Sequence, residues 1–401
     1  MTTYIIIGNG VAGNAAAEAI RRHDAAGKII IFSRDRYPFY YVPALPEFLA
    51  GEQDLKKLII HDREWYEKNQ IDLHLETGIA GIEAAQKAVV TDKGERYRYD
   101  RLLLATGGTS FIPPIKGADL EGVFTLRTLG DAEKIKDVAH RSRQAVLIGG
   151  GLLGLEAGNG LRKAGLKITV VEFFPRLLPR QMDVPGAARL QGQMEEMGFN
   201  FYLGAKTREI RRDAQGLHVE LEGGESLGAD LVLISAGVRP ELTLAKSLGL
   251  ETDKGLKVDD HLKTALEGIY AAGDLIEHQG RFYGIWPAAM EQGKVAGAAM
   301  AGQMVKYEGT VVSNTLKVVG IDLFSAGEID AEGTLESIVW KDEAGKTYRK
   351  LVIKENVLVG AILLGDIRGS HEIQQAIKAR KDLTPLKPDL AEEQFDFKRL
   401  L

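Results

Sequence analysis

The 401-residue sequence predicts an α/β fold with two parallel-sheet domains followed by a C-terminal α+β domain. Short apolar runs without alternation, such as residues 4–7 and 145–148, are typical of strands buried on both faces of a parallel sheet. Each of these two runs leads into a glycine-rich turn and then a helical pattern, so the same unit occurs twice. From about residue 311 the pattern changes to alternating runs, as in antiparallel strands.

The composition excludes several classes of function. A net charge of −5 argues against the basic surface of a nucleic-acid-binding protein. Cysteine is absent, which excludes disulfides, thiolate metal sites, iron–sulfur clusters and cysteine nucleophiles, and the histidines show no metal-ligand spacing, so no metal is expected. No apolar run reaches the roughly 18 residues of a membrane span, and the first residues lack the basic start of a signal peptide. We therefore expect a cytoplasmic enzyme without membrane or nucleic-acid partners.

The first unit is a strand at residues 4–7, a turn, a helix at 14–22 and a strand at 28–32. Its turn has the G-x-G-x-x-G spacing of dinucleotide-binding loops. In such loops the first glycine makes the turn, the second lets backbone amides approach a pyrophosphate, and the third lets strand and helix pack closely. An ordinary strand–helix turn is the alternative, and the repeat of the unit weakens it. The residues expected against the pyrophosphate are Gly8, Gly10, Val11, Ala12 and Gly13.

The second unit repeats this pattern, with strands at 145–148 and 167–171. Glu172 ends its second strand, where a carboxylate accepts hydrogen bonds from a ribose 2′-hydroxyl and repels a 2′-phosphate. Phe173 follows, where a phosphate-binding site would have arginine, although Arg176 is near. The unit therefore predicts NADH in preference to NADPH. Its loop is expected to contact the dinucleotide through Gly149, Gly151, Leu152, Leu153 and Gly154.

The first unit lacks such a carboxylate, because Ser33 stands at the equivalent position and is followed by Arg34. Both are expected near the adenosine ribose. Further strands at 101–105, 231–235 and 268–271 also run into glycine. Two dinucleotide sites in one chain imply a stored FAD and an exchanging nicotinamide dinucleotide, with hydride passing from the nicotinamide to flavin N5. The strand ends add Ala105, Thr106, Gly107, Gly237, Gly273 and Asp274 to the expected cofactor sites.

These motifs resemble the two-dinucleotide flavoprotein reductases of the pyridine nucleotide–disulfide oxidoreductase superfamily. The resemblance implies two Rossmann-like dinucleotide-binding domains, for FAD and NAD, and a C-terminal α+β domain. Because the family's chain crosses between domains twice, we expect an FAD-binding domain at 1–110 and 236–310, an NAD-binding domain at 111–235 and an interface domain at 311–401. The resemblance runs nearly end to end and rests on residues 8–13, 104–107, 149–156, 236–240 and 270–274.

The absence of cysteine narrows the resemblance. Disulfide reductases, peroxidases and water-forming oxidases keep a redox cysteine on the segment corresponding to residues 40–44, and this sequence has none. Electrons must then leave directly from the flavin. Two positions depart from the relatives: Val42 replaces a frequent arginine, and Glu47 replaces the lysine of the ferredoxin-reductase branch. The subfamily that the chain resembles is NADH:rubredoxin oxidoreductase, on residues 37–47, 64–69, 316–320 and 365–366.

The resemblance also implies roles outside the glycine loops. Pro43 would pack beside the isoalloxazine where others keep cysteine, Glu156 would reach the nicotinamide or the flavin edge, and Lys317 would face the dimethylbenzene edge or an acidic partner. Their structural alternatives are a loop-shaping proline, a helix glutamate and a surface lysine. Asp274 would accept from the ribityl hydroxyls, and the dipole of the helix from residue 286 would stabilise reduced anionic flavin. The expected contacts also include Ala80, Phe173 and Ala289.

The function implied is that of an FAD-dependent oxidoreductase that accepts hydride from NADH and passes electrons singly to a rubredoxin-like carrier protein. Alternatives are a hydrogen-peroxide-forming NADH oxidase, an NADH–flavin module related to nitrite reductase, and a redox-sensing flavoprotein that binds NADH. Monomer and homodimer both fit. The tail after residue 381 is expected to be extended. Because such carriers are acidic, a basic docking face is expected, with candidates Lys317, Arg368, Lys378, Arg380 and Lys381.

Overall fold

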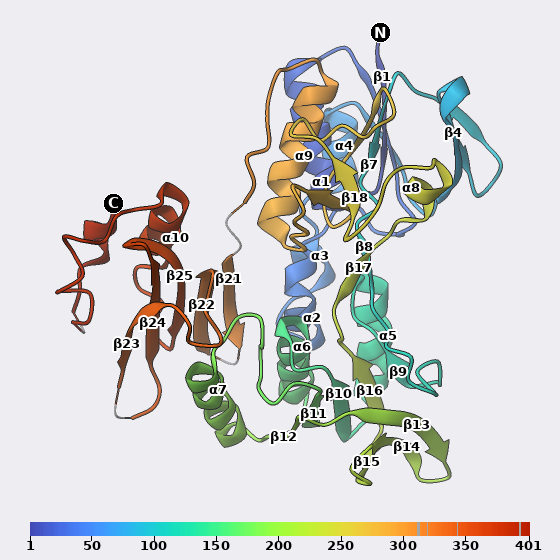
Figure 1. Ribbon diagram of the computed structural model, residues 1–401. Coiled ribbons are helices and arrows are strands. Elements are labelled where there is room, and N and C mark those ends of the chain that lie inside the picture. The colour runs from blue at the N-terminus through green and yellow to red at the C-terminus, as the bar shows by residue number, and fades with distance from the viewer. Residues whose placement is uncertain (311–312, 319, 343, 393) are drawn as a thin grey trace.

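The computed structural model describes residues 1–310, 313–318, 320–342, 344–392 and 394–401, with the side chains of 313–318 left out. Figure 1 shows three lobes: an N-terminal lobe at the top, a second lobe below it and the C-terminal lobe at the side. In this described part of the chain, no helix is long and apolar enough to cross a membrane.

The first lobe is built on a five-stranded parallel sheet in the order β19-β7-β1-β2-β3. The central strand is fully buried at Ile5 and Ile6, as an apolar run without alternation predicts. Helices α1 (Val11–His23) and α9 (Trp286–Met300) pack against each other in this lobe (Figure 1). The strands are β1 (Thr3–Ile7), β2 (Lys28–Phe32), β3 (Ile71–His74), β7 (Arg101–Leu104) and β19 (Ile269–Ala271).

The second lobe repeats the design with a parallel sheet in the order β12-β11-β10-β16-β9. In both sheets the strand before the glycine loop lies between the next strand of its unit and a later strand, so the predicted duplication of the α/β fold is confirmed. The helices are α5 (Leu129–Ala139), α6 (Leu152–Lys163) and α7 (Val184–Glu196). The strands are β9 (Val123–Phe124), β10 (Gln144–Ile148), β11 (Lys167–Glu172), β12 (Phe199–Leu203) and β16 (Leu231–Ile234).

The chain passes from the first parallel sheet to the second and back. The outgoing strand β8 (Gly108–Ser110) pairs antiparallel with the returning strand β17 (Val238–Pro240). The expected domain boundaries stay a prediction. Smaller sheets combine β4 (Ile79–Glu83), β5 (Ala88–Thr91) and β6 (Arg96–Arg98); β13 (Thr207–Asp213), β14 (Gly216–Leu221) and β15 (Ser226–Ala229); and β18 (Leu256–Val258) with β20 (Ile276–His278). The remaining helices of these lobes are η1 (Val42–Ala44), α2 (Leu45–Leu49), α3 (Leu55–Leu58), α4 (Arg63–Lys68), η2 (Ala84–Gln86) and α8 (Thr243–Ser247).

The C-terminal lobe is an antiparallel sheet in the order β21-β22-β25-β24-β23, covered by α10 (Ser370–Ala379). The expectation of an extended tail is wrong. The tail folds back through turns and the short helix η3 (Phe397–Leu400), because its apolar side chains Leu383, Leu386, Leu390, Phe395 and Leu400 are buried in the core of this lobe. The strands are β21 (Ser313–Val318), β22 (Ile321–Gly327), β23 (Glu336–Lys341), β24 (Tyr348–Lys354) and β25 (Val357–Leu364).

Two contacts between lobes position the elements of the site. Helix α2, on the chain segment between β2 and β3 of the first lobe, packs its apolar side chains into the core of the second lobe. It lies so close to α6 that a Cβ on Gly160 would be 2.4 Å from the carbonyl oxygen of Pro46. The second contact is a buried ion pair, in which Lys350 Nζ on β24 lies 3.3 Å from a carboxylate oxygen of Asp183, the residue that caps α7. The hydroxyl of Tyr348 donates to the same carboxylate at 2.7 Å. The C-terminal lobe is therefore held against α7 of the second lobe.

Candidate functional site

The first glycine loop has the shape of a phosphate cradle. Gly8 has φ +120°, and a Cβ there would be 2.0 Å from the carbonyl oxygen of Ala105. A Cβ on Gly13 would be 2.0 Å from the carbonyl oxygen of Gly8, whereas a Cβ on Gly10 would meet no atom within 4 Å. The loop is thus closed on its packed side and open at Gly10. Helix α1 begins there without a side-chain cap, so its first amides remain available to an anion such as a pyrophosphate.

The second loop repeats this geometry. Gly149 has φ +117°, and a Cβ there would be 2.2 Å from the carbonyl oxygen of Ser235. A Cβ on Gly154 would be 2.5 Å from the carbonyl oxygen of Gly149, whereas the space at Gly151 is open within 4 Å. Helix α6 also begins without a side-chain cap, with Leu152 and Leu153 in its first turn. The two loops therefore fit one dinucleotide each.

The predicted residues around the first loop follow strands of one parallel sheet, so they meet at its carboxyl edge. Gly8 follows β1, Ser33 and Arg34 follow β2, and Ala105, Thr106 and Gly107 follow β7. Gly273 and Asp274 follow β19 at the same edge. The structure brings all of them together with Val11 and Ala12 in the first turn of α1, and with Ala289, which is buried on α9.

Asp274 has a charged partner that sequence reasoning missed. Arg127 Nη2 donates to Asp274 Oδ2 at 2.6 Å, and Arg127 Nε donates to the carbonyl oxygen of Gly108 at 3.1 Å. The side chain of Asp274 is 15% exposed and that of Arg127 is 29% exposed, so this ion pair is partly shielded from water. Arg127 lies between β9 and α5, where no glycine motif marks it. Its only sequence signal is a basic residue just before the helix cap at Thr128.

Glu172 lies at the second loop, as predicted. Its side chain is buried, and its two oxygens accept from the backbone N–H groups of Gly150 at 2.6 Å and Phe174 at 2.8 Å. Phe173 and Phe174 are exposed beside it. Arg176 donates instead to the carbonyl oxygens of Pro179 and Met182, within its own loop. At the end of β11 the charged side chain that contacts the second loop is therefore Glu172 and not Arg176.

Pro43 and Glu156 lie on the two sides of the α2–α6 contact. Pro43 is exposed in η1, which runs directly into α2. Glu156 lies on α6, where burial first and then Glu47 on α2 raise the pKa of its carboxyl group to about 7. Such a group holds and releases a proton near neutral pH. It stands one helical turn before Gly160, the point of closest approach between the two helices.

Three other predicted residues lie farther from the loops. Ala80 is exposed in β4, although a Cβ on the preceding Gly78 would be 3.2 Å from Arg34 Nε, so the start of β4 lies beside Arg34. Gly237, with φ +103°, leads from β16 to β17. Lys317 lies in β21, and its side chain is outside what the structure describes.

Aromatic side chains surround the start of α9. Trp286, its first residue, stacks on Phe39 with ring centres 5.7 Å apart and meets Tyr41 edge-on at 5.1 Å. Tyr41 is 44% exposed and directly precedes η1. The N-terminus of α9 is therefore in contact with aromatic side chains, and one of them, Tyr41, lies two residues before Pro43. Among the described residues, no group of three or more potential ligands could hold a metal ion.

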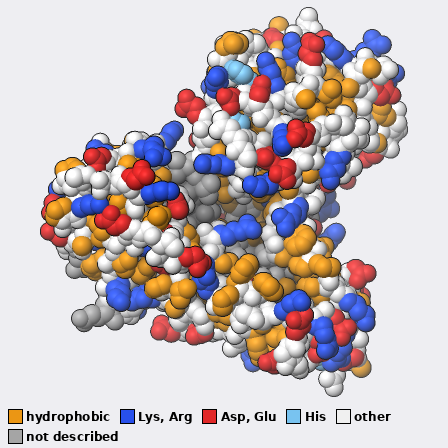
Figure 2. All heavy atoms as spheres, viewed as in Figure 1, with side chains coloured by type: hydrophobic (Ala, Val, Ile, Leu, Met, Phe, Trp, Pro, Cys, Tyr) orange, Lys and Arg blue, Asp and Glu red, His pale blue; other side chains and the backbone are white. Residues whose placement is uncertain are grey.

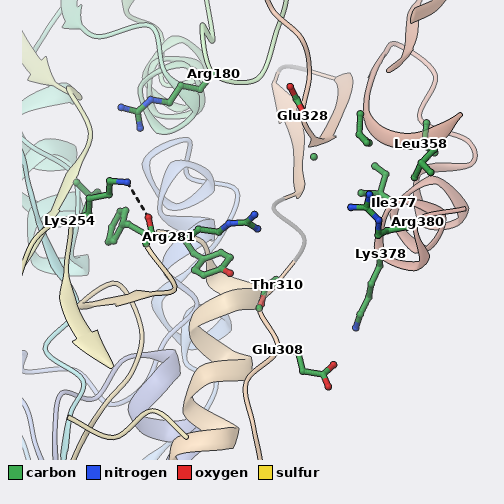
Figure 3. Close-up of a pocket in the computed structure, with 18 of the residues that line it drawn as sticks. Arg180, Lys254, Arg281, Glu308, Thr310, Glu328, Leu358, Ile377, Lys378 and Arg380 are labelled. Carbon is green, nitrogen blue, oxygen red and sulfur yellow. Dashed lines mark hydrogen bonds between the residues drawn. The ribbon is translucent and has the colours of Figure 1, made fainter. Parts of the chain in front are cut away.

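A cleft of about 1000 Å³ opens where the three lobes meet. Figure 3 shows Arg281, from the turn before α9, and Arg380, from the end of α10, reaching toward it from opposite sides. Figure 2 shows blue side chains around this hollow. Only Glu308 and Glu328 in its lining are acidic. Its basic lining residues are Arg180, Arg239, Lys254, Arg281, Lys378 and Arg380.

All six are exposed, and none of them forms an ion pair in the described part of the chain. Two of them belong to the docking face expected from the sequence. Two of the other expected residues are engaged elsewhere, since Arg368 bonds to Asp366 and Lys381 Nζ donates to the carbonyl oxygen of Leu401. The side chain of Lys317, the remaining one, lies outside what the structure describes. Positive charge without an ion-pair partner in the described part of the chain thus lines the cleft.

Comparison with known proteins adds independent evidence. Residues 2–293 match the family model for pyridine nucleotide-disulphide oxidoreductases, and residues 313–381 match the rubredoxin NAD+ reductase C-terminal domain. The chain is 36% identical over 382 residues to the NAD(P)H nitrite reductase of Bacillus subtilis (strain 168), which covers 95% of this chain and 48% of that protein. It is 30% identical over 383 residues to the NADH-rubredoxin oxidoreductase of Clostridium acetobutylicum, which covers 95% of each.

A solved structure agrees with this match. The covalent complex of putidaredoxin reductase with putidaredoxin has a TM-score of 0.91 at 25% identity, covering 100% of this chain and 98% of that one. The chain spans about half the length of the nitrite reductase and of other curated relatives that it matches. FAD and NADH are the cofactors of this family, in agreement with the two loops. The chain therefore belongs to the pyridine nucleotide-disulphide oxidoreductase family.

Proposed function

We propose that this protein oxidises NADH and passes the electrons one at a time to a small acidic carrier protein of the rubredoxin type. FAD held at the first loop supplies the chemistry that accepts two electrons from NADH and releases them singly. The chain's own residues bind and orient the cofactors. Gly8, Gly10 and Gly13 shape the FAD cradle, and Asp274 with Arg127 borders it.

Glu172 supports NADH as the electron donor. A buried carboxylate at the end of β11 fits a ribose 2′-hydroxyl and repels a 2′-phosphate. Arg176 is turned toward backbone carbonyls of its own loop, so it is not aimed at a 2′-phosphate. Glu156, whose carboxyl pKa is about 7, is placed at the contact between the lobes that carry the two loops. We assign it the positioning of the nicotinamide beside the flavin.

The cleft carries the proposal for the acceptor. Six basic side chains without ion pairs in the described part of the chain attract an acidic carrier and orient it by charge. The cleft includes Tyr283, which lies three residues before the start of α9. The first residue of α9, Trp286, contacts Tyr41, which lies two residues before Pro43, the residue expected beside the flavin. The similarity to an NADH-rubredoxin oxidoreductase over 95% of both chains supports the same type of acceptor. No cysteine is present to take electrons from the flavin by thiol chemistry.

Anaerobic stopped-flow absorbance tests this function. The flavin of the purified protein is first reduced by NADH, and the reduced protein is then mixed with oxidised rubredoxin or with oxygen. We expect fast reduction by NADH, slow reduction by NADPH, and reoxidation by rubredoxin that is at least about tenfold faster than reoxidation by oxygen at equal concentration. Faster reoxidation by oxygen than by rubredoxin would replace the carrier reductase with an NADH oxidase.

The nitrite reductase match favours a second candidate function. Identity of 36% to a protein about twice as long suggests that this chain is the NADH-oxidising part of a larger electron-transfer assembly. The same basic cleft would then receive a partner subunit instead of a free carrier. Purified protein that is reduced by NADH yet transfers no electrons to rubredoxin, but does transfer them to a co-purifying partner, would select this candidate.

A further inference from the structure

Behind the first glycine loop lies a buried group of polar side chains. Asn14 on α1 is 1% exposed, Tyr66 on α4 is 2% exposed, and His61 just before α4 is 9% exposed. Buried polar groups need hydrogen-bond partners, because an unpaired one costs free energy. The partners of these three side chains therefore indicate what the group does.

Asn14 connects the group to the loop. Its Nδ2 donates to the carbonyl oxygen of Asn9 at 3.0 Å, to Asn9 Oδ1 at 2.9 Å and to the carbonyl oxygen of Gly10 at 3.1 Å. Its Oδ1 accepts from the hydroxyl of Tyr66 at 2.7 Å and lies 3.3 Å from His61 Nδ1. The Tyr66 hydroxyl is also 3.0 Å from Asn9 Oδ1. Two peptide groups of the loop are thus tied to α4 through one amide.

The second loop provides an internal comparison, because it has the same glycine spacing. Gly150 and Leu155 occupy the positions of Asn9 and Asn14. Leu155 is fully buried, and its side chain cannot form hydrogen bonds. The peptide groups around Gly150 are held differently: its N–H donates to Glu172 at 2.6 Å, and its carbonyl oxygen accepts from the backbone N–H of Leu178 at 3.2 Å. The two loops therefore share their shape and differ in what holds it.

His61 keeps the group fixed and uncharged. Its ring stacks on Trp65 at 3.5 Å with an interplanar angle of 6°. Burial lowers the pKa of His61 to about 4, so the ring is neutral at neutral pH. Two carboxylates face it: Glu18 on α1, 3.3 Å from Nε2, and Asp62, the cap of α4, which acts on it electrostatically. A neutral ring in one orientation fits a structural support better than a titrating group.

We propose that Asn14, Tyr66 and His61 form a brace that holds the peptide groups of Asn9 and Gly10 in the shape that binds the FAD pyrophosphate. The brace makes the first loop the one that retains its dinucleotide, whereas the second loop, which lacks it, exchanges NADH. A loop held in its bound shape loses less conformational entropy on binding. The three residues are positioning residues, and the inference rests on the placement of FAD at the first loop under the proposed function.

The test is the rate of FAD release from the holoenzyme after dilution, followed by the rise in free flavin fluorescence. We expect Tyr66→Phe to release FAD about tenfold faster than wild type, since one buried hydrogen bond to the loop is lost. Asn14→Leu, which copies Leu155 of the second loop, is expected to release it faster still. The dissociation constant for NADH should stay within about twofold of wild type. It is measured from the dependence of the flavin-reduction rate on NADH concentration.

Tyr99→Phe is the matched control. Tyr99 is also buried in the core of the first lobe, but its hydroxyl forms no hydrogen bond with the described part of the chain. Equal FAD release from Tyr66→Phe and Tyr99→Phe would overturn the brace, even if Asn14→Leu failed to fold. A protein that shows the expected release rates but reduces no carrier would support the brace and overturn the proposed function.

Discussion

Glu172 ends β11 with both carboxylate oxygens bonded to backbone N–H groups, which fixes its charge beside the second loop. Replacing Glu172 with Ser removes the charge that repels a 2′-phosphate. We expect the ratio of kcat/KM for NADH to kcat/KM for NADPH to fall by at least about tenfold in Glu172→Ser. Steady-state assays with the two nucleotides measure this ratio. An unchanged ratio would mean that the preference arises elsewhere.

Glu156 couples stability to pH. Burial raises the pKa of its carboxyl group from 4.5 to about 7, so the folded protein binds this proton more tightly than the unfolded chain does. The resulting stabilisation is complete below about pH 4.5 and is lost as pH rises through 7. Glu156→Gln removes it. Between pH 5 and 8, we expect the free energy of unfolding to fall by about 1–3 kcal/mol more in wild type than in Glu156→Gln.

Denaturant unfolding of the two proteins at pH 5 and pH 8 measures this difference. The comparison uses the change with pH within each protein, so a constant effect of the substitution on packing cancels. If the free energy of unfolding changed equally with pH in both proteins, the carboxyl group of Glu156 would titrate as an ordinary surface glutamate.

At the scale of elements, the contact between α1 and α9 positions the first loop. A Cβ on Gly293 would be 2.3 Å from the carbonyl oxygen of Ala12, and a Cβ on Gly297 would be 2.3 Å from that of Ala16. Gly293→Ala should therefore push α9 away from α1 at Ala12, which belongs to the first glycine loop. We expect a loss of about 2 kcal/mol or more in the free energy of unfolding, together with faster FAD release.

Gly192→Ala is the control for this substitution. Gly192 lies within α7, and a Cβ there would meet no atom within 4 Å. Because alanine favours helices more than glycine does, this variant should gain up to about 1 kcal/mol. Denaturant unfolding of both variants gives the comparison. Equal effects of the two substitutions would show that the α1–α9 contact can relax at little cost.

Sequence patterns predicted the elements that depend on local signals. The two strand–loop–helix units were predictable because their glycines and apolar runs are contiguous. The ion pair of Arg127 with Asp274 was not, because it joins residues from different lobes. The brace was missed for a similar reason, since Asn14 and Tyr66 are 52 residues apart in the sequence and their side chains meet only in the folded lobe. The tail was wrongly expected to be extended because proline and charged residues masked its spaced apolar side chains.

At the scale of the whole molecule, the cleft shows that a protein with a negative net charge can carry a locally positive surface. The chain carries a net charge of −5, yet basic side chains from segments far apart in the sequence converge on one cleft. Sequence reasoning anticipated Lys378 and Arg380, because both lie at the end of one helical pattern, residues 370–380. It could not anticipate Arg180 or Arg281, since folding of all three lobes brings them there (Figure 3).

The central claim is that reduced flavin delivers electrons to an acidic carrier at this cleft. Its most direct test is the second-order rate constant for reoxidation by oxidised rubredoxin, measured by anaerobic stopped flow over a range of ionic strength. The variants are Arg281→Glu and Arg380→Glu. Lys167→Glu is the control, because Lys167 is exposed at the start of β11, whereas the second loop and Glu172 lie at the opposite edge of that sheet.

We expect the wild-type rate constant to fall as salt rises, since ions screen the attraction. At low ionic strength each cleft variant should be at least about tenfold slower than wild type and than Lys167→Glu, and all four rate constants should converge at high salt. Rate constants that are independent of salt and equal in the cleft variants and the control would contradict docking at the cleft.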